Sequence, residues 1–140
     1  MNYSLKRDLN KVDWSDVADI FRAVSWGDRD ELNLKNAFEK SHEVVFAYEN
    51  KGMIGFGRVI SDGEYYAAIY DLIVHPEHQK KGVGSKILKD LISRCPGMIF
   101  INLTATLDHI DFYKKNGFVL QNSAMFLPAH EKQREMFSAD

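Results

Sequence analysis

The chain begins with two segments in which apolar residues recur every three or four positions. In the first, the apolar positions are Trp14, Val17, Ile20, Phe21 and Val24. This spacing predicts an amphipathic helix, and Asp13 and Asp16 supply an N-terminal cap and acidic charge in its first turn. A second helix is predicted over residues 28–40, where Leu34, Ala37 and Phe38 share one face.

The middle of the chain changes to the patterns of β-strands. Residues 44–48 and 53–60 are apolar runs joined by the turn 49–52, and they predict two antiparallel strands. The turn at Asp62-Gly63 leads into a strand over residues 65–74. Residues 98–103 form another continuous apolar run. We expect it to be a central strand, covered on both faces and adjacent to residues 65–74.

Helical and strand patterns alternate through the rest of the chain. Val83, Ile87, Leu88, Leu91 and Ile92 form an apolar stripe that predicts a helix packed on the sheet and stopped by residues 96–97. A short helix is predicted over residues 108–116, with Gly117 as its C-terminal cap. Residues 118–120 and 124–127 are predicted closing strands, and residues 129–140 a polar tail.

Composition narrows the class of protein. The chain has 140 residues, 45% of them hydrophobic, which is enough for one compact domain over residues 1–128. The 18 Lys and Arg residues nearly balance the 20 Asp and Glu residues, so the net charge creates no positive field that would attract nucleic acid. Without an apolar run of membrane length or a signal peptide, we expect a cytoplasmic protein without membrane contact. The single cysteine, Cys95, is expected to be a small structural residue. No metal is expected.

The turn before the helix at residues 83–92 has the features of an anion-binding site. Gly82 and Gly84 let the backbone approach a ligand, and the first amides of a helix have no carbonyl partners inside it. Six basic side chains crowd this turn, which favours a polyanionic ligand; a solvated helix face is the alternative. They are His75, His78, Lys80, Lys81, Lys86 and Lys89. The Lys-Ser/Thr ending of a Walker loop and the glycine spacing of a dinucleotide fingerprint are both missing.

Gln79-x-x-Gly82-x-Gly84, which follows Val74-x-Pro76, resembles the acetyl-CoA pyrophosphate loop of GNAT acetyltransferases. The order of the predicted elements is similar to theirs over nearly the whole chain. The resemblance implies an α/β (α+β) fold whose mixed, mostly antiparallel central sheet is flanked by helices. It also implies acetyl-CoA as cosubstrate. The residues it assigns to acetyl-CoA are Leu72, Ile73, Val74, Gln79, Lys80, Lys81, Gly82, Val83, Gly84, Ser85 and Asn102.

A second motif runs from Asp111 to Phe118 and resembles the Phe-Tyr-x-x-x-Gly-Phe signature of the last GNAT helix. The resemblance places the hydroxyl of Tyr113 near the acetyl-CoA sulfur, where a phenol could protonate the departing thiolate as a general acid. Core packing is the alternative for a Phe-Tyr pair. Thr106 and His109 stand where many members have Asn and Ala, so the resemblance assigns no CoA contacts there.

No general base transfers from the resemblance, because the strand before the loop has no glutamate at the matching positions. Strand alternation puts Asp71 on the face opposite Tyr70 and Leu72, where a structural hydrogen-bonding role is expected. Glu64 and Tyr66, near the start of the strand, are candidate bases. Ordered water is the alternative.

Residues 55–63, the strand around Asp71, and residues 76–79 and 125–128 look like a GNAT branch that contains plant and cyanobacterial serotonin N-acetyltransferases. The branch implies a small-molecule primary amine acceptor, attacked directly in a ternary complex. Trp26, Phe56, Tyr66 and Tyr70 are candidate acceptor walls, with core packing as the alternative. Acetylation of a protein or peptide, and a non-catalytic acyl-CoA-binding regulatory module, stay open. A homodimer is compatible with the resemblance.

Overall fold

The computed structural model describes residues 2–140. It consists of two compact units, one that ends at Leu103 and one from Thr104 to Asp140, and we describe them one at a time. Within residues 2–140, no helix is long and apolar enough to cross a membrane.

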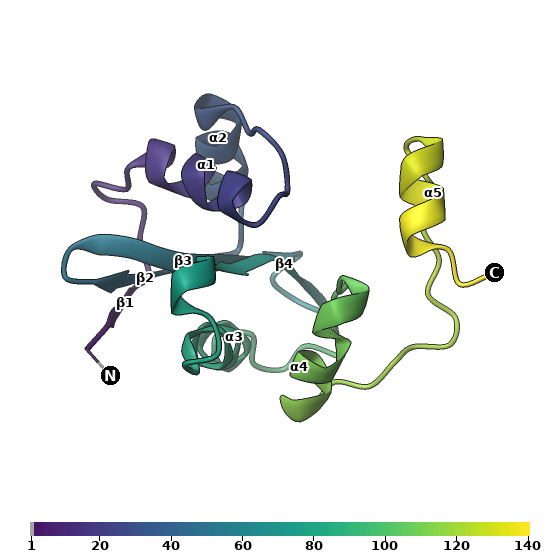
Figure 1. The fold of residues 1–140 in the computed structure, drawn as a ribbon. Helices are drawn as coiled ribbons and strands as arrows, with labels where there is room; N and C mark the ends of the chain where they lie inside the picture. The colour runs from purple at the N-terminus through teal and green to yellow at the C-terminus, as the bar shows by residue number, and fades with distance from the viewer. Residues whose placement is uncertain (1) are drawn as a thin grey trace. The chain divides into compact units, whose positions relative to one another are not determined.

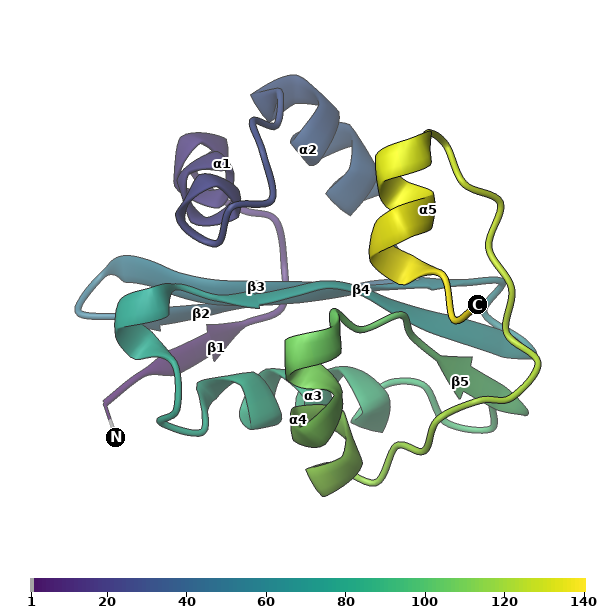
Figure 2. The same cartoon turned by 45° about the vertical axis from the view of Figure 1, so that its right-hand side comes forward.

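The first unit is a five-stranded sheet with helices on both faces. Its strands are β1 (Ser4–Lys6), β2 (Glu43–Glu49), β3 (Gly52–Ser61), β4 (Tyr66–Val74) and β5 (Phe100–Asn102), in the order β1-β2-β3-β4-β5. The first four strands are antiparallel, and β5 runs parallel to β4. Helices α1 (Trp14–Ala23) and α2 (Glu31–Glu39) cover one face, and α3 (Val83–Ser93) covers the other (Figures 1 and 2). The expected mixed, mostly antiparallel sheet flanked by helices is confirmed.

The helices begin where their capping residues stand. The side chain of Asp13 accepts a hydrogen bond from the Ser15 amide at 2.9 Å, and Asp30 accepts one from the Asn33 amide at 2.9 Å. Each aspartate satisfies an amide that has no partner inside its helix. The first helix therefore has the predicted cap, and the second begins at Glu31.

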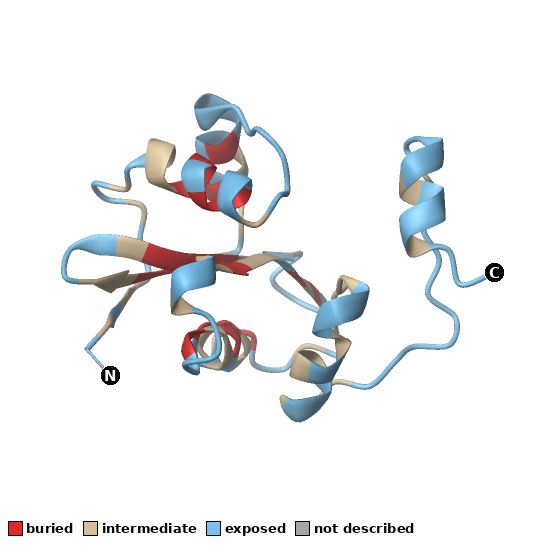
Figure 3. Cartoon of the chain, viewed as in Figure 1, coloured by how far each residue is buried: buried red, intermediate tan, exposed pale blue. Residues whose placement is uncertain are grey.

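An aromatic core fills the space between the sheet and the helices α1 and α2. Figure 3 shows buried segments in α1, α2 and the strands of the sheet. Phe21, Phe38, Phe46 and Phe56 in these elements are each at most 1% exposed. Their ring centroids lie between 5.5 and 6.4 Å apart in four pairs, in tilted, stacked and edge-on arrangements. Such pairs add to the free energy gained by burying their apolar area. This core fixes α1 and α2 on the sheet.

The opposite face of the sheet packs on α3. Val83, Ile87, Leu88 and Leu91 are buried, which confirms the predicted apolar stripe. A Cβ atom at Gly57 would lie 3.0 Å from Leu91 Cδ1 and 3.1 Å from Ile87 Cγ2. Gly57 thus lets α3 approach β3 closely. Cys95, just after α3, is buried, and burial raises the pKa of its thiol, consistent with the structural role expected for it.

The strand predicted over residues 98–103 differs from the expectation. Its position beside β4 is confirmed, but β5 has only three residues and lies at the edge of the sheet formed by residues 2–103. Phe100 is 45% exposed. The prediction of a central, doubly covered strand is wrong because an apolar run alone does not specify a partner on each side.

The second unit contains a 3₁₀ turn, η2 (Leu107–His109), and the helices α4 (Ile110–Lys115) and α5 (Glu131–Phe137). Gly117 has φ +92°, so it ends α4 as predicted. The closing strands predicted at 118–120 and 124–127 are wrong, because these described segments have no strand pairing and Phe126 packs instead on Phe137. The tail 129–140 contains α5, built from residues that favour helices.

Candidate functional site

Within residues 2–103, the edge of β4 that faces away from β3 is unpaired over most of its length. Only Tyr66, Ala67 and Ala68 pair with β5, so within residues 2–103 no strand pairs with residues 69–74 on that side. The amide of His75 donates to the carbonyl of Ile54 at 2.8 Å, which directs the backbone of His75 toward β3. Bonding direction alternates along a strand. The backbone groups of Val74 and Leu72 therefore point to the free edge.

A β-bulge in β4 interrupts this alternation. Arg58 pairs with Tyr70 and Phe56 pairs with Ile73, so two steps along β3 are matched by three along β4. Asp71 lies in the bulge with φ +52°, in the left-handed region. Its carboxylate accepts a hydrogen bond from Arg58 Nε at 2.8 Å, which confirms the predicted hydrogen-bonding role.

The bulge also changes which face Asp71 occupies. The guanidinium of Arg58 lies 5.9 Å from the ring centroid of Tyr70 while it bonds Asp71. Tyr70 and Asp71 therefore share the face covered by α1 and α2. Of the three residues from Tyr70 to Leu72, Leu72 alone lies on the α3 face. The expectation that Asp71 lies opposite Tyr70 is wrong, because the extra residue interrupts the two-residue period.

Between β4 and α3 the chain forms the 3₁₀ turn η1 (Pro76–His78) and a loop with two left-handed residues, Lys80 (φ +63°) and Gly82 (φ +85°). Gln79 Nε2 donates to the Val74 carbonyl at 2.9 Å and ties the loop to the end of β4. The amide of Gln79 donates to the Pro76 carbonyl at 3.4 Å. The loop is therefore held at its start by hydrogen bonds of its own.

The N-terminus of α3 differs from those of α1 and α2. Gly82 is its N-cap, and within the described residues no side chain caps it. Its first turn, which the structure describes completely, carries no acidic residue, whereas α1 has Asp16 and α2 has Glu31. The amides and the positive end of the helix dipole thus lack an internal counter-charge. Nearby exposed lysines, Lys80 and Lys81, add to the positive potential. This arrangement suits a phosphate group.

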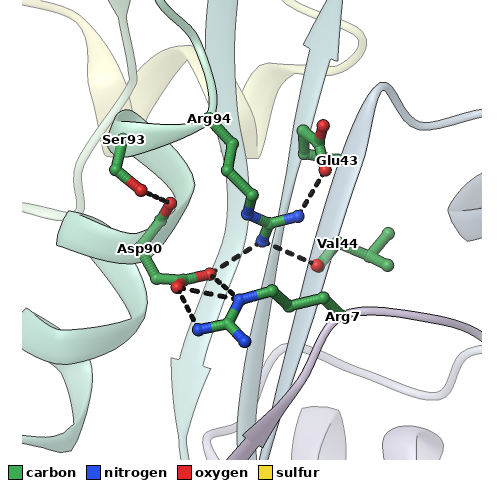
Figure 4. A network of polar contacts seen from close by, with 6 residues as sticks. All are labelled: Arg7, Glu43, Val44, Asp90, Ser93 and Arg94. Atoms are coloured by element: carbon green, nitrogen blue, oxygen red, sulfur yellow. Dashed lines mark hydrogen bonds and ion pairs between the residues drawn. The ribbon is translucent and has the colours of Figure 1, made fainter.

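The other end of α3 is held by a polar network (Figure 4). Asp90 accepts from Arg7 Nη2 at 2.6 Å and from Arg94 Nη2 at 2.8 Å. Arg94 also bonds the Glu43 carboxylate and, at 2.9 Å, the Val44 carbonyl on β2. Partial burial pushes the pKa of Asp90 upward, but the hydrogen bonds from both arginines outweigh it and the pKa lies below its ordinary value. The network fixes α3, and with it the loop, on the sheet.

In the second unit, Tyr113 lies on α4 between two aromatic rings. Its ring centroid is 5.0 Å from that of Phe112 and 5.8 Å from that of Phe118, both edge-on. Burial raises the pKa of Tyr113 to about 12. The phenol therefore keeps its proton at neutral pH, as a general acid must before it acts.

The aromatic residues proposed for the acceptor fall into two groups. Phe56 is completely buried in the aromatic core, so it has no surface to offer a ligand and the core alternative holds. Tyr66 and Tyr70 are about half exposed, and Trp26 is 37% exposed with its ring 6.2 Å from Phe21. These three keep accessible surface.

Tyr66 and Asn102 line a hollow of about 420 Å³ beside the paired parts of β4 and β5 and the end of β3. The turn beside it is built by Asp62, whose carboxylate accepts hydrogen bonds from the amides of Glu64, Tyr65 and Tyr66 at 2.8–3.1 Å. These bonds lower the pKa of Asp62, first of all the bond from Glu64. The expected turn role of Asp62 is confirmed.

The loop lies where the sequence predicts it, but the bulge and the role of Arg58 in it were not predicted. A charged residue inside the apolar run 69–74 was the only signal. Asp tolerates left-handed backbone better than most residues, and such a residue in a strand is a weak indication of a bulge.

No metal-ligand cluster accompanies the site: within residues 2–140, no three or more His, Cys, Asp or Glu side chains are arranged to hold a metal ion.

Comparison with known proteins agrees with this geometry. A family model described as an acetyltransferase (GNAT) domain matches residues 40–120. The "Uncharacterized N-acetyltransferase ycf52" of Pyropia yezoensis is 30% identical over 122 residues, which are 83% of this chain and 68% of that protein. "Serotonin N-acetyltransferase 2, chloroplastic" of Oryza sativa subsp. japonica is 26% identical over 140 residues, which are 95% of this chain and 70% of that protein.

A solved structure has the same fold. A putative acetyltransferase from Deinococcus radiodurans superposes with a TM-score of 0.81 at 24% identity, covering 91% of this chain and 89% of that one. This superposition shows that the two chains share a fold. The chain belongs to the GNAT acetyltransferase family and is an N-acetyltransferase.

Proposed function

We propose that the protein transfers acetyl from acetyl-CoA to the primary amine of a small molecule, by direct attack in a ternary complex. The observation that carries the proposal is the continuous path from the free backbone edge of β4 to the uncapped N-terminus of α3. One end of this path suits an extended amide-bearing chain, and the other suits a pyrophosphate. Coenzyme A has both groups in that order.

The loop from Gln79 to Ser85 would hold the pyrophosphate with backbone amides. The amides of Val83 and Gly84 open α3 and are the best placed, since the Gln79 amide already bonds the Pro76 carbonyl. The side chain of Gln79 would act indirectly, by fixing the loop on Val74. Lys80 and Lys81 would add long-range attraction for the phosphates.

The pantetheine arm would lie along β4. Its amides would exchange hydrogen bonds with the outward backbone groups of Leu72 and with the amide of Val74, as an added strand does. The Val74 carbonyl already accepts a hydrogen bond from Gln79 Nε2. Ile73 is buried and its backbone faces β3, so it would support this edge rather than touch the ligand. Asn102, at the end of β5, would border the opening between the two strands.

The chemical step needs few protein groups. A neutral amine attacks the thioester carbonyl carbon, a C–N bond forms, the C–S bond breaks, and the thiolate leaves with the electron pair. By its resemblance to the tyrosine of the last GNAT helix, Tyr113 would donate its phenolic proton to that sulfur. The ammonium formed on attack would lose its proton to solvent, and the tyrosinate would take up a proton from solvent, which restores the phenol. With a pKa raised to about 12, Tyr113 is protonated at neutral pH before this transfer. The products are an N-acetyl amine and CoA.

The choice of acceptor rests on the relatives and on exposed aromatic surface. The rice relative is named for serotonin, an arylalkylamine. Tyr66, Tyr70 and Trp26 are exposed enough to stack on an aromatic or aliphatic amine.

The test is calorimetry with acetyl-CoA, followed by CoA release with aryl amines, polyamines, aminoglycosides and peptides as acceptors. Turnover on a small amine supports the proposal. Turnover on peptides alone would identify a protein acetyltransferase. Binding without turnover would indicate an amine outside these four classes or a regulatory module, and absence of binding would remove acetyl-CoA as the cosubstrate.

A further inference from the structure

The bulge at Asp71 holds a non-glycine residue in a conformation that side chains disfavour. A left-handed backbone costs an L-residue roughly 1–2 kcal/mol, so surrounding contacts must maintain it. The contact at this point is the ion pair with Arg58, whose Nε lies 2.8 Å from Asp71 Oδ2. The two side chains are only 15% and 13% exposed, so solvent screens the pair less than a surface ion pair.

The side chain of Arg58 is itself held in place by residues of α2 and of the turn that follows α2. Arg58 Nη1 donates to Ser41 Oγ at 3.2 Å, and Ser41 Oγ donates to the Ala37 carbonyl at 2.8 Å. The guanidinium also lies 5.6 Å from the ring centroid of Phe38. A fixed guanidinium loses little side-chain entropy on pairing. The carboxylate of Asp71 therefore meets a partner that is already in place.

We propose that Arg58 and Asp71 are positioning residues for the acetyl-CoA edge: their ion pair holds the β4 bulge, and the bulge directs the backbone groups of Leu72 to that edge. Leu72 follows the bulge directly, so its amide and carbonyl turn with the backbone angles of Asp71. Val74 is further secured by the buried Ile73 and by Gln79. This inference rests on the proposed binding of acetyl-CoA along β4.

The consequence of losing the pair is local. The strand cannot slip by a whole residue, because the slip would expose Ile73, which packs in the aromatic core. Instead Asp71 is free to leave the left-handed region, and the Leu72 groups tilt away from the line of the edge. One or two ligand hydrogen bonds would then be lost, which corresponds to a roughly tenfold weaker Kd for acetyl-CoA.

Three substitutions at position 71 separate backbone conformation from charge. Asp71→Ala removes the ion pair and lacks the side-chain polar group that helps Asp and Asn tolerate φ +52°. Asp71→Gly removes the pair but adopts that conformation freely, and Asp71→Asn keeps both an acceptor for Arg58 and some left-handed tolerance. We expect Asp71→Ala to weaken acetyl-CoA binding roughly tenfold, and Asp71→Gly and Asp71→Asn to recover most of the loss.

Arg58→Gln supplies a second measurement. Alone it should weaken acetyl-CoA binding severalfold, and in the Asp71→Gly background it should cause no further loss, because glycine no longer needs the pair. Asp19→Ala is the control, since it removes one side of an exposed Arg–Asp pair on α1. Calorimetry gives each Kd, and thermal unfolding shows which variants are folded.

The outcomes separate this inference from the proposed function. A wild-type chain that does not bind acetyl-CoA overturns both. A binding wild type with an equally tight, folded Asp71→Ala variant overturns the inference alone. Equal loss of kcat in the Ala, Gly and Asn variants, with Kd unchanged, also overturns it and would assign the Asp71 carboxylate to the chemical step.

Discussion

Gly82 offers the sharpest test of the proposed phosphate loop. It is the N-cap of α3 with φ +85° and an otherwise uncapped helix after it. Valine has a strong preference against this conformation, since even a small L-residue pays roughly 1–2 kcal/mol there. In Gly82→Val the loop would relieve the strain by changing its backbone angles, and the amides of Val83 and Gly84 would no longer converge on one point.

The loss of binding follows from those amides. A hydrogen bond to a charged group contributes about 1.5–3 kcal/mol, so misdirecting two of them removes roughly 3 kcal/mol or more. That is about a hundredfold weaker Kd for acetyl-CoA, measured by calorimetry. Folding should lose only the smaller backbone term, seen as a modest fall in Tm.

Gly97 provides the matched control, because it lies just beyond the opposite end of α3 with φ +75°, and a Cβ atom added there would meet nothing within 4 Å. Gly97→Val should lower Tm by a similar amount and leave the acetyl-CoA Kd unchanged. If a folded Gly82→Val variant bound acetyl-CoA like the wild type, the assignment of the loop to the pyrophosphate would be refuted.

Three further predictions concern other parts of the chain. Tyr113→Phe should lower kcat by roughly 10²-fold or more and leave the acetyl-CoA Kd unchanged, as rapid-mixing and calorimetric measurements would show; an unchanged kcat would exclude the general acid role. Because the folded pKa of Asp90 is depressed, its contribution to stability is complete above the ordinary value of 3.8 and is lost as the pH falls through the lower folded value. Acid titration of unfolding should therefore be less steep below about pH 4 in Asp90→Asn than in the wild type, and equal slopes would contradict the coupling. Phe56→Ala should reduce the free energy of unfolding by about 3–5 kcal/mol in urea denaturation, and a loss under about 1 kcal/mol would argue against its core position.

The elements that pack a regular face on the sheet could be predicted from the sequence. The stripe from Val83 to Leu91 and the cap at Asp13 depend on local spacing, and both are confirmed. The edge strands of the sheet and the registers between its strands could not be predicted from local spacing. Whether residues 98–103 form a central or an edge strand depends on partners far along the chain, and the bulge at Asp71 depends on how β4 aligns with β3.

In the candidate site, too, some features could be predicted from the local sequence and others depend on the folded sheet. Glycines and lysines mark the loop in the sequence because they supply conformational freedom and charge locally. The burial of Phe56 and the pairing of Arg58 with Asp71 depend on which face each side chain takes in the folded sheet. Such choices are visible only once the strands are aligned.

The network around Asp90 has a consequence for the order in which the chain folds during synthesis. Arg7 and Asp90 are 83 residues apart in sequence, and Glu43 and Arg94 are 51 apart. The aromatic core draws most of its side chains from residues that precede β4, so it can begin to form on the ribosome before α3 has emerged. Closing these two loops must wait until Asp90 and Arg94 have emerged. The helix that carries the proposed phosphate loop is therefore secured late, after the surface that receives it is in place.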